Sequence, residues 1–503
     1  MKEETRIVIA FGLALAVIIF FSMMPNKRQP ISGPQQPEST GTIKEVSEGP
    51  VGFEISNKIK EFKNQLYNFS VDLLGGKIIS FSLNGYTRPG EKNFLFFQNG
   101  NTLLDTVDGE TSQAVYDIDP ESKSGLLILK AKRNGLEHEK IIEMSPSGYS
   151  LKVSITQKNI SDKNISVGGL NISLGTLILN KHHPEEAFVD FMVINSGKPY
   201  KFNIARQMKE KISGNGCVVR TRYQMYYFRS DEPVEFHVEN KASRISWGFH
   251  IQPVELAAAQ SRKFNFSLYM GPSDYFVARS EIKDIRVFGT GFFVSMGRFI
   301  FYILNSIHRI IPNWGLAIII LTVLIKLIFF PLTRSSLRSM KQMQKLRPYL
   351  QDIQKKYREN SQMLQKEMMN LYKTYKINPF GGCVPMLIQI PIFVGFFLAL
   401  RSSIYLRGSG FILWIKDLSL PDTVASIGSI PINILPFLMF ITSFFQQRIA
   451  PAVEQSQKFM NIVLPLMMLV LFYNFSSGLL LYWVTMNLAG LIEQYYIYRL
   501  ARK

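Results

Sequence analysis

Cysteine is scarce in this chain, which has only Cys217 and Cys383 among its 503 residues. Both fall in segments that the pattern of basic loops assigns to opposite sides of a membrane, so no disulfide between them is expected. Catalytic signatures are missing as well: there is no nucleophile motif, no zinc-peptidase helix and no phosphate-binding loop. These absences argue against an enzyme and against a bound metal or cofactor.

Acidic residues are also under-represented, since 38 Asp and Glu stand against 57 Lys and Arg, a formal net charge of +19. Such an excess could indicate nucleic-acid binding, but basic loops gathered on one side of a membrane explain it without that partner. The chain is 47% hydrophobic and contains 38 Phe, too apolar in places to be wholly soluble. Part of it is therefore expected to lie in lipid.

The apolar run from Trp314 to Thr333 is long enough to cross a bilayer as a helix, about 30 Å at 1.5 Å per residue. It carries one ionisable side chain, Lys326. A central lysine costs about 2.5–3.5 kcal/mol on insertion, so Lys326 is expected to face a protein interior or a wet cavity. The alternative is snorkelling, in which its stem reaches towards lipid headgroups at the Thr333 end.

The N-terminal region is predicted to be a membrane anchor followed by a tether. Residues Ile7–Met24 form an uncharged apolar run with basic flanks, which assigns residues 1–24 to a first transmembrane anchor. A cleavable signal peptide is the alternative, but the run is longer than usual and no small-x-small cleavage site follows it. Residues 25–50 are rich in Pro, Gly, Ser, Thr and Gln and are expected to form a flexible linker.

Residues 51–281 are predicted to form a large antiparallel β-sandwich outside the membrane. Short segments with one apolar and one polar face alternate with turns, and helical periodicity is scarce. The clearest strands are Tyr149–Ile155, Leu170–Leu174, Val234–Val238 and Phe264–Leu268. One group of residues has the side chains of a metal site but is better explained as an exposed polar turn around a proline. Its members are His182, His183, Glu185 and Glu186.

Residues 282–312 are predicted to form an amphipathic helix on the outer membrane surface. Apolar residues recur at spacings of three and four from Phe292 to Ile307, and polar residues such as Arg298 and His308 interrupt them. Pro312 then ends the helix. The alternative is a soluble helix packed on the sandwich.

A basic segment, residues 334–378, follows the helix of Lys326. Only Asp352, Glu359 and Glu367 oppose its many Lys and Arg residues. The positive-inside rule therefore places this segment in the cytoplasm and the sandwich outside. Two apolar patterns on either side of a polar break predict an antiparallel helical hairpin.

The rest of the chain is predicted to lie mostly in the membrane. Four further spans are expected at residues 381–400, 430–445, 459–475 and 479–492. With the helix of Lys326 they make residues 313–503 a five-helix core, and with the anchor they give six spans and cytoplasmic termini. The predicted fold class is a polytopic α-helical membrane protein with a large external antiparallel β-sandwich.

Three stretches of the core resemble the YidC/Oxa/Alb family of membrane protein insertases. They are NWGLAIIILTVLIKLIFFPLT (Asn313–Thr333), KEMMNLYKTYKINPFGGCVPMLIQIPIF (Lys366–Phe393) and FSSGLLLYWVTMNLAGLIEQ (Phe475–Gln494). The resemblance covers residues 292–503, and the overall plan is similar to members from two-membrane bacteria. It implies a non-enzymatic insertase of the inner membrane with a supersandwich-like periplasmic domain. Implied partners are nascent membrane proteins, the Sec translocon and the lipid bilayer.

The resemblance also implies a polar groove among the core spans, open to cytoplasm and lipid. Its charged position falls on Lys326, where many relatives have arginine, and Thr322 matches a substrate contact one helical turn earlier. Tyr482 matches an aromatic residue of the family. Trp483 stands where many bacterial relatives have tyrosine, which keeps the bulk and replaces a hydroxyl by an indole donor.

Two polar residues inside predicted spans, Gln389 and Asn487, are added as groove candidates from residue type alone. Either could instead bond to a neighbouring helix. A hydrated groove would reduce the cost of moving a polar tail across hydrocarbon, and Lys326 would attract acidic residues of that tail.

Basic residues at two predicted cytoplasmic sites are candidate ribosome contacts, because ribosomal RNA is polyanionic. They are Lys355, Lys356 and Arg358 on the hairpin and Arg499, Arg502 and Lys503 near the C-terminus. A solvated charged face is expected on any such hairpin, so the charge alone does not establish a partner.

The main alternative function is a small-solute transporter with a carbohydrate-binding periplasmic domain. Two features argue against it: the spans show no repeat between their halves, and Lys326 is a lone charge where a transporter would use an ion relay. A cell-envelope sugar-modifying enzyme is a third hypothesis, but it rests on analogy with other sandwich domains alone.

Overall fold

The computed structural model describes most of the chain from residue 58 onwards. The described residues are 58–88, 91, 94–97, 102–105, 113–123, 125–178, 189–195, 197–202, 208–241, 244–375, 377, 384–428, 430–449 and 455–500. The predicted anchor (1–24), the linker (25–50) and the polar turn with His182 and His183 lie outside them.

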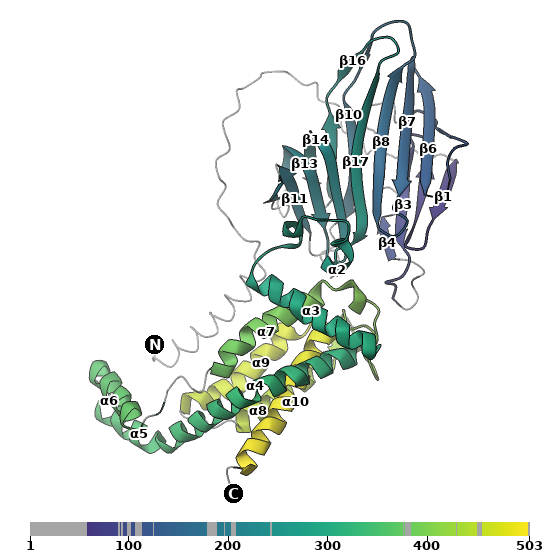
Figure 1. Cartoon of the computed structure of the whole chain (residues 1–503). Coiled ribbons are helices and arrows are strands. Elements are labelled where there is room, and N and C mark those ends of the chain that lie inside the picture. The colour runs from purple at the N-terminus through teal and green to yellow at the C-terminus, as the bar shows by residue number, and fades with distance from the viewer. Residues whose placement is uncertain are drawn as a thin grey trace. The chain divides into compact units, whose positions relative to one another are not determined.

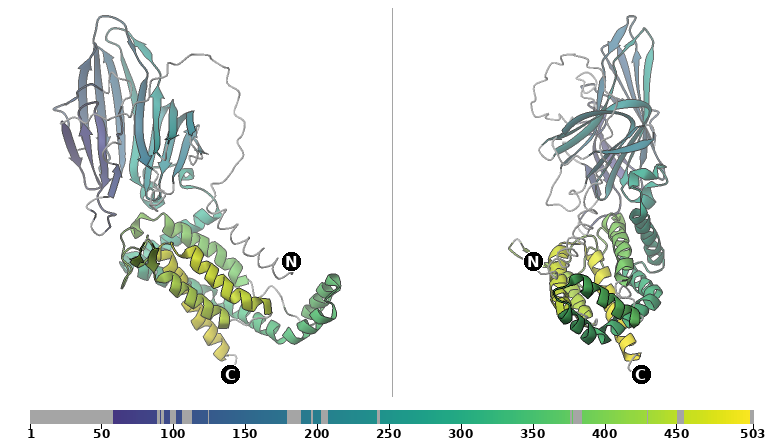
Figure 2. Two further views of the ribbon diagram at one scale, coloured as in Figure 1. Left: turned by 180° about the vertical axis from the view of Figure 1, so that it is seen from behind. Right: turned by 90° about the vertical axis from the view of Figure 1, so that its left-hand side faces the viewer.

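The chain divides into two compact units. The strand unit comprises the residues up to Gly85 together with Lys92–Val287, and the helical unit comprises Tyr86–Glu91 together with Phe288–Lys503. Figures 1 and 2 show β-sheets in the first and a helix bundle in the second.

The strand unit is built from antiparallel sheets. Its elements are β1 (Ile59–Lys63), β2 (Tyr67–Asp72), β3 (Lys77–Leu83), β4 (Phe94–Phe97), β5 (Asp117–Ile118), β6 (Leu126–Arg133), β7 (Leu136–Met144), β8 (Ser150–Asn159), β9 (Ile165–Val167), β10 (Leu170–Ile178), β11 (Asp190–Asn195), β12 (Lys198–Phe202), β13 (Met208–Arg220), β14 (Gln224–Lys241), β15 (Arg244–Ile251), β16 (Val254–Leu256), β17 (Ser261–Pro272), α2 (Tyr275–Ala278) and η1 (Ile285–Phe288). Strands β1 to β4 form one sheet in that order. The large sheet has eleven strands and runs β12-β11-β13-β14-β17-β8-β7-β6-β5, with β15 on β14 and β10 on β15. Figure 1 shows β17, β8, β7 and β6 side by side.

Alternation of apolar and polar residues explains these strands, as β8 illustrates. Leu151, Val153 and Ile155 are buried, whereas the residues between them are more exposed. Across the pair with β17, Ile155 lies opposite Phe264 and Val153 opposite Phe266, so both strands present one apolar face to the same core. The four clearest predicted strands fall on β8, β10, β14 and β17. The prediction of a large antiparallel sandwich is confirmed.

Helices make up most of the helical unit. Its elements are α3 (Phe292–Ile310), α4 (Trp314–Lys345), α5 (Arg347–Lys356), α6 (Ser361–Thr374), α7 (Val384–Arg401), η2 (Ile404–Leu406), β18 (Thr423–Ile427), β19 (Ile430–Asn433), α8 (Leu435–Ile449), α9 (Gln455–Phe472) and α10 (Ser477–Leu500). Helix α10 packs against α4 and α8, and α3 packs against α7. Among the described residues, α4 is the one helix whose length and hydropathy suffice to cross a bilayer, and shorter apolar stretches occur at Leu387–Arg401 and Ile462–Phe472.

Helix α3 begins later than the predicted amphipathic helix, at Phe292. The preceding glycines Gly289 and Gly291 have positive φ angles of 86° and 117°, which interrupt helical backbone. Gly297 lets α3 approach α7 closely, because a Cβ there would lie 3.2 Å from the carbonyl oxygen of Gly395. The helix therefore packs within the helical unit.

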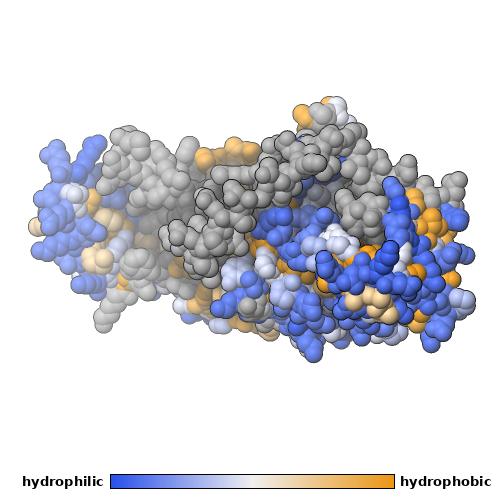
Figure 3. All heavy atoms as spheres, turned by 90° about the horizontal axis from the view of Figure 1, so that it is seen from above, coloured by the Kyte–Doolittle hydropathy of each residue, from blue (hydrophilic) through white to orange (hydrophobic). Residues whose placement is uncertain are grey.

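The predicted hairpin of residues 334–378 is shorter in the structure, because α4 continues through Pro331 to Lys345. The helix breaks at Leu346, and Pro348 stands in the first turn of α5, where its missing N–H costs little. Leu346 and Leu350 are the buried core of the hairpin. Partly buried apolar residues pack against them: Met343, Met368, Leu371, Tyr372 and Ile377. Figure 3 shows the hydrophilic surface of α5 and α6, in blue at the left-hand end.

The span predicted at residues 430–445 is wrong at its start. Residues Ile430–Asn433 form β19, which pairs with β18 through a turn containing Gly428 at φ 61°. Asp422 then fixes the start of α8, since its carboxylate accepts hydrogen bonds from the backbone N–H groups of Ile434 (3.0 Å) and Leu435 (2.7 Å). The β-branched residues of β18 and β19 therefore form a β-hairpin before α8 begins.

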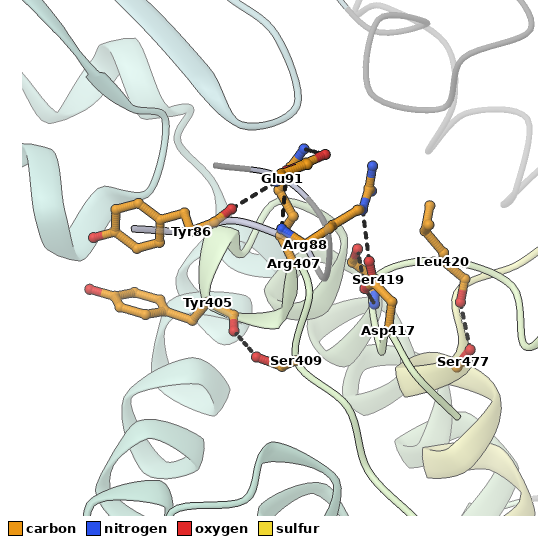
Figure 4. Close-up of polar contacts among 10 residues, drawn as sticks. All are labelled: Tyr86, Arg88, Glu91, Tyr405, Arg407, Ser409, Asp417, Ser419, Leu420 and Ser477. Atoms are coloured by element: carbon orange, nitrogen blue, oxygen red, sulfur yellow. Dashed lines mark hydrogen bonds and ion pairs between the residues drawn. The ribbon is translucent and has the colours of Figure 1, made fainter. Parts of the chain in front are cut away.

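A polar clamp holds the segment Tyr86–Glu91 within the helical unit (Figure 4). The guanidinium of Arg407 donates two hydrogen bonds to the carboxylate of Glu91, at 2.7 and 3.0 Å, and one to the Tyr86 carbonyl, at 2.7 Å. Arg88 donates to Asp417 at 2.9 Å. Hydrogen bonding from Arg407, above all, lowers the pKa of Glu91. The side chain of Arg407 is only 4% exposed, so the clamp compensates a buried cation.

We predict that Glu91→Gln destabilises the helical unit at neutral pH by about 1–2 kcal/mol, because a buried guanidinium loses its counter-charge. Since the folded pKa of Glu91 lies below its unfolded value, its contribution is present above the unfolded pKa and disappears as the pH falls through the folded pKa. Thermal unfolding of the purified protein, followed from pH 7 down to pH 3, measures the difference. Glu359→Gln, at an exposed position between α5 and α6, is the control. Equal effects of the two changes at pH 7 would contradict the prediction.

Candidate functional site

A cavity of about 310 Å³ lies inside the helical unit, between α4, α7, α8 and α10. We call it the groove. Its polar lining residues are Lys326, Thr333, Ser336, Gln389, Gln446, Tyr482, Trp483, Asn487, Glu493 and Gln494. Apolar side chains such as Ile325, Phe329 and Ile392 complete the wall. Polar groups therefore converge on one hollow within an otherwise apolar bundle.

The charged centre of the groove is an ion pair. The ammonium nitrogen of Lys326 on α4 lies 3.6 Å from a carboxylate oxygen of Glu493 on α10. Their side chains are 19% and 7% exposed, respectively. The ammonium group of Lys326 is thus directed at α10.

Glu493 is the residue that the sequence analysis missed. The predicted last span ended at Ile492, which left Glu493 just outside it. In the structure α10 continues to Leu500, so the carboxylate lies on a helical face directed at α4. A helical pattern extended past the apolar window could have found it. The ion pair with Glu493 also shows that Lys326 is not the lone charge that the sequence suggested.

The backbone of α10 approaches Lys326 closely at Gly490. A Cβ at this position would lie 2.4 Å from the amide nitrogen of Gln446 and 3.4 Å from the ammonium of Lys326. Glycine within a helix costs about 1 kcal/mol relative to alanine. Its presence is explained by the room that Gln446 and Lys326 need.

Aromatic and amide side chains line the other part of the groove. Gln389 on α7 donates a hydrogen bond to the hydroxyl of Tyr482 at 2.6 Å. The ring of Tyr482 stacks on Phe396, with centroids 4.1 Å apart. Trp483 meets Phe393 edge to face at 4.8 Å. Two of the predicted groove residues, Gln389 and Tyr482, are therefore bonded to each other.

Comparison with known proteins identifies the chain's family. The membrane protein insertase YidC of Francisella philomiragia is 30% identical over 472 residues, covering 86% of this chain and 82% of that relative. The chain belongs to the YidC family of membrane protein insertases. The family model described as 60Kd inner membrane protein matches residues 306–503, a range that contains every residue lining the groove.

Two further YidC similarities were found. The insertase YidC of Endomicrobium trichonymphae is 39% identical over 249 residues, which are 49% of this chain and 48% of that relative. In that alignment the chain spans about half the relative's length. A crystal structure of an active YidC insertase with its first transmembrane domain resolved covers 88% of this chain and 93% of its own, at 18% identity and a TM-score of 0.40.

YidC membership settles the class of protein. YidC proteins are non-enzymatic insertases of the bacterial inner membrane, which confirms the predicted family and class. The solute-transporter alternative has no support among these relatives.

Thr322 and Asn487 have their own partners in this YidC chain. The Thr322 side chain is fully buried, and its hydroxyl donates to the Ile318 carbonyl at 2.6 Å. It is not among the residues lining the groove, so a substrate contact there stays a prediction from resemblance. Asn487 lines the groove but donates to Thr442 (3.1 Å) and Ser443 (2.7 Å) on α8, which is the helix-packing role left open above.

Three of the basic candidates for ribosome contact, Lys355, Lys356 and Arg358, are not among the residues lining the groove. Lys355 and Lys356 form the last turn of α5, and Arg358 follows that helix. Arg499 belongs to α10, but its side chain is outside the described residues, as are Arg502 and Lys503.

Proposed function

We propose that this chain inserts membrane proteins by receiving the polar tail of an incoming protein in the groove while the hydrophobic span of that protein enters lipid. The Lys326–Glu493 pair is the observation that carries the proposal. A polar, charge-bearing hollow inside an apolar bundle is what such a tail requires, because a charged group in hydrocarbon is costly unless it is paired or hydrated.

The groove acts by reducing a desolvation penalty. A tail crossing hydrocarbon loses the water around its backbone and charges, and each unsatisfied backbone group costs several kcal/mol. Gln389, Gln446 and Gln494 supply amide groups along the groove that replace part of this water. Burial of the new apolar span in lipid drives the process, so neither ATP nor a metal is required.

Lys326 has a specific part in this mechanism. Its ammonium attracts acidic residues of the tail, and the surrounding apolar helices strengthen that attraction relative to bulk water. Gln389 and Tyr482, joined by their hydrogen bond, and the ring of Trp483 form the opposite wall for the passing chain.

The proposed topology has six spans, with the strand unit in the periplasm and both termini in the cytoplasm. Helices α4, α7, α8, α9 and α10 serve as five spans, and residues 1–24 serve as the first. The surplus of Lys and Arg between α4 and α7 supports a cytoplasmic hairpin. Helix α3, with Phe292, Phe299 and Tyr302 exposed, suits the outer interface.

Two partners are proposed beyond the substrate. Basic residues of α5 and of the C-terminal end, including Lys355, Lys356 and Arg499, suit a salt-sensitive contact with a translating ribosome. The Sec translocon is proposed from the family resemblance alone.

We predict that Lys326→Ala slows insertion of substrates with acidic tails more than of those with neutral tails, while Lys326→Arg has little effect because the charge survives. The measurement is the insertion rate of one single-span protein, made with either tail, into liposomes containing matched amounts of each variant. If insertion proceeds but the acidic-to-neutral ratio is the same for Lys326→Ala and the parent, Lys326 has no part in the mechanism. Absence of insertion by the parent would refute the function itself.

We also predict that deleting residues 51–261, with α3 retained, preserves insertion activity. The deletion removes Glu91, so it leaves Arg407 without its carboxylate and lowers thermal stability. Arg407→Gln in the deleted protein should therefore recover part of that stability. A deleted protein that is folded and membrane-inserted yet inactive would show that the deleted residues are required and would contradict the prediction.

A further inference from the structure

The acidic partner of Lys326 has no role in a mechanism that uses the lysine alone. Among the described residues that line the groove, Lys326 and Glu493 are the two charged side chains. Their charges cancel. A groove built only to attract acidic tails would be weakened by a carboxylate beside its cation, so Glu493 needs an explanation of its own.

The geometry of the pair is that of an exchangeable counter-ion. At 3.6 Å the two atoms are too far apart for a hydrogen bond. Neither carboxylate oxygen of Glu493 has a hydrogen bond of normal geometry from the described residues, although the side chain is only 7% exposed and the hydroxyl of Thr333 lies beside it. A buried carboxylate that lacks hydrogen bonds is poorly stabilised in its place. Exchanging it at Lys326 for another carboxylate replaces one ion pair by another and breaks no hydrogen bond of normal geometry, while the displaced Glu493 is solvated by water and by the polar side chains that line the groove.

The groove has room for the exchange. Its volume of about 310 Å³ is roughly ten times the 30 Å³ that a water molecule occupies in the liquid. Gln494 also lines it, and its amide oxygen is buried without a hydrogen-bond partner among the described residues. Polar atoms of an incoming chain would satisfy this acceptor.

We propose that Glu493 is the resting counter-ion of Lys326 and sets the charge preference of the groove for the tails of its substrates. The proposal rests on the insertase function above. An acidic side chain of the tail displaces Glu493 from Lys326, and a basic side chain pairs with Glu493 instead. The groove thereby accepts short polar segments of either charge, where a lone lysine would select acidic ones.

The test uses Glu493→Gln, which removes the charge and keeps the shape. Insertion into liposomes is measured for one single-span protein carrying an acidic, a neutral or a basic tail. We expect the acidic-to-neutral rate ratio to rise by at least about two- to fivefold, the range for solvent-exposed ion pairs and hence a minimum for this buried one, and the basic-to-neutral ratio to fall. Lys326→Met should shift both ratios in the opposite direction. The double variant should show no dependence on tail charge.

Glu359→Gln, an exposed carboxylate outside the groove, is the matched control and should keep the parental ratios. If Glu493→Gln slows all three tails equally and the double variant recovers, Glu493 only holds Lys326 in place and the proposal is overturned. Parental ratios in Glu493→Gln overturn it too. Both results leave the insertase function intact, provided that the parent inserts the neutral-tailed protein.

Discussion

The ammonium group of Lys326 lies among largely apolar helices, where an unpaired charge would cost several kcal/mol. Residues around the groove reduce this cost by pairing with the ammonium group and by making room for it. Helix α10 continues past its apolar stretch and brings Glu493 within 3.6 Å. Gly490 opens the face of that helix, and Gln446 fills the space beside the ammonium. A hollow with polar walls results, in a bundle whose other surfaces are suited to lipid.

Two buried cations of the helical unit are compensated in different ways. Arg407 makes a bidentate, hydrogen-bonded contact with Glu91, and this geometry fixes the segment that carries Glu91. Lys326 faces Glu493 at a longer distance, and neither oxygen of that carboxylate has a hydrogen bond of normal geometry from the described residues. The two hydrogen bonds between Arg407 and Glu91 hold that ion pair together. The Lys326–Glu493 ion pair can be separated by a competing charge on a substrate, which is the property that a substrate groove needs.

Sequence reasoning reached Lys326 because a charge in an apolar run is rare and needs a cause. It also reached Gln389 and Tyr482, but it could not show that they are bonded, since that contact joins α7 to α10. Glu493 was missed because hydropathy marks where a helix leaves the apolar layer and not where the helix ends. The start of α8 was misplaced because the isoleucines of residues 430–434 suit a strand as well as a span. Each error concerns a boundary decided by tertiary contacts.

The proposed mechanism requires that the side of α4 facing the groove is hydrated and that its other side is not. Ile325 lines the groove, and Leu327 is 63% exposed and is not among the lining residues, although both lie at the same depth of one helix. In a protein with Cys217 and Cys383 replaced by serine, Ile325→Cys and Leu327→Cys would be treated in membranes with a thiol reagent that is soluble in water and not in lipid. Rapid labelling is expected at position 325 and protection at position 327. Protection of both positions, or faster labelling at 327, would contradict it.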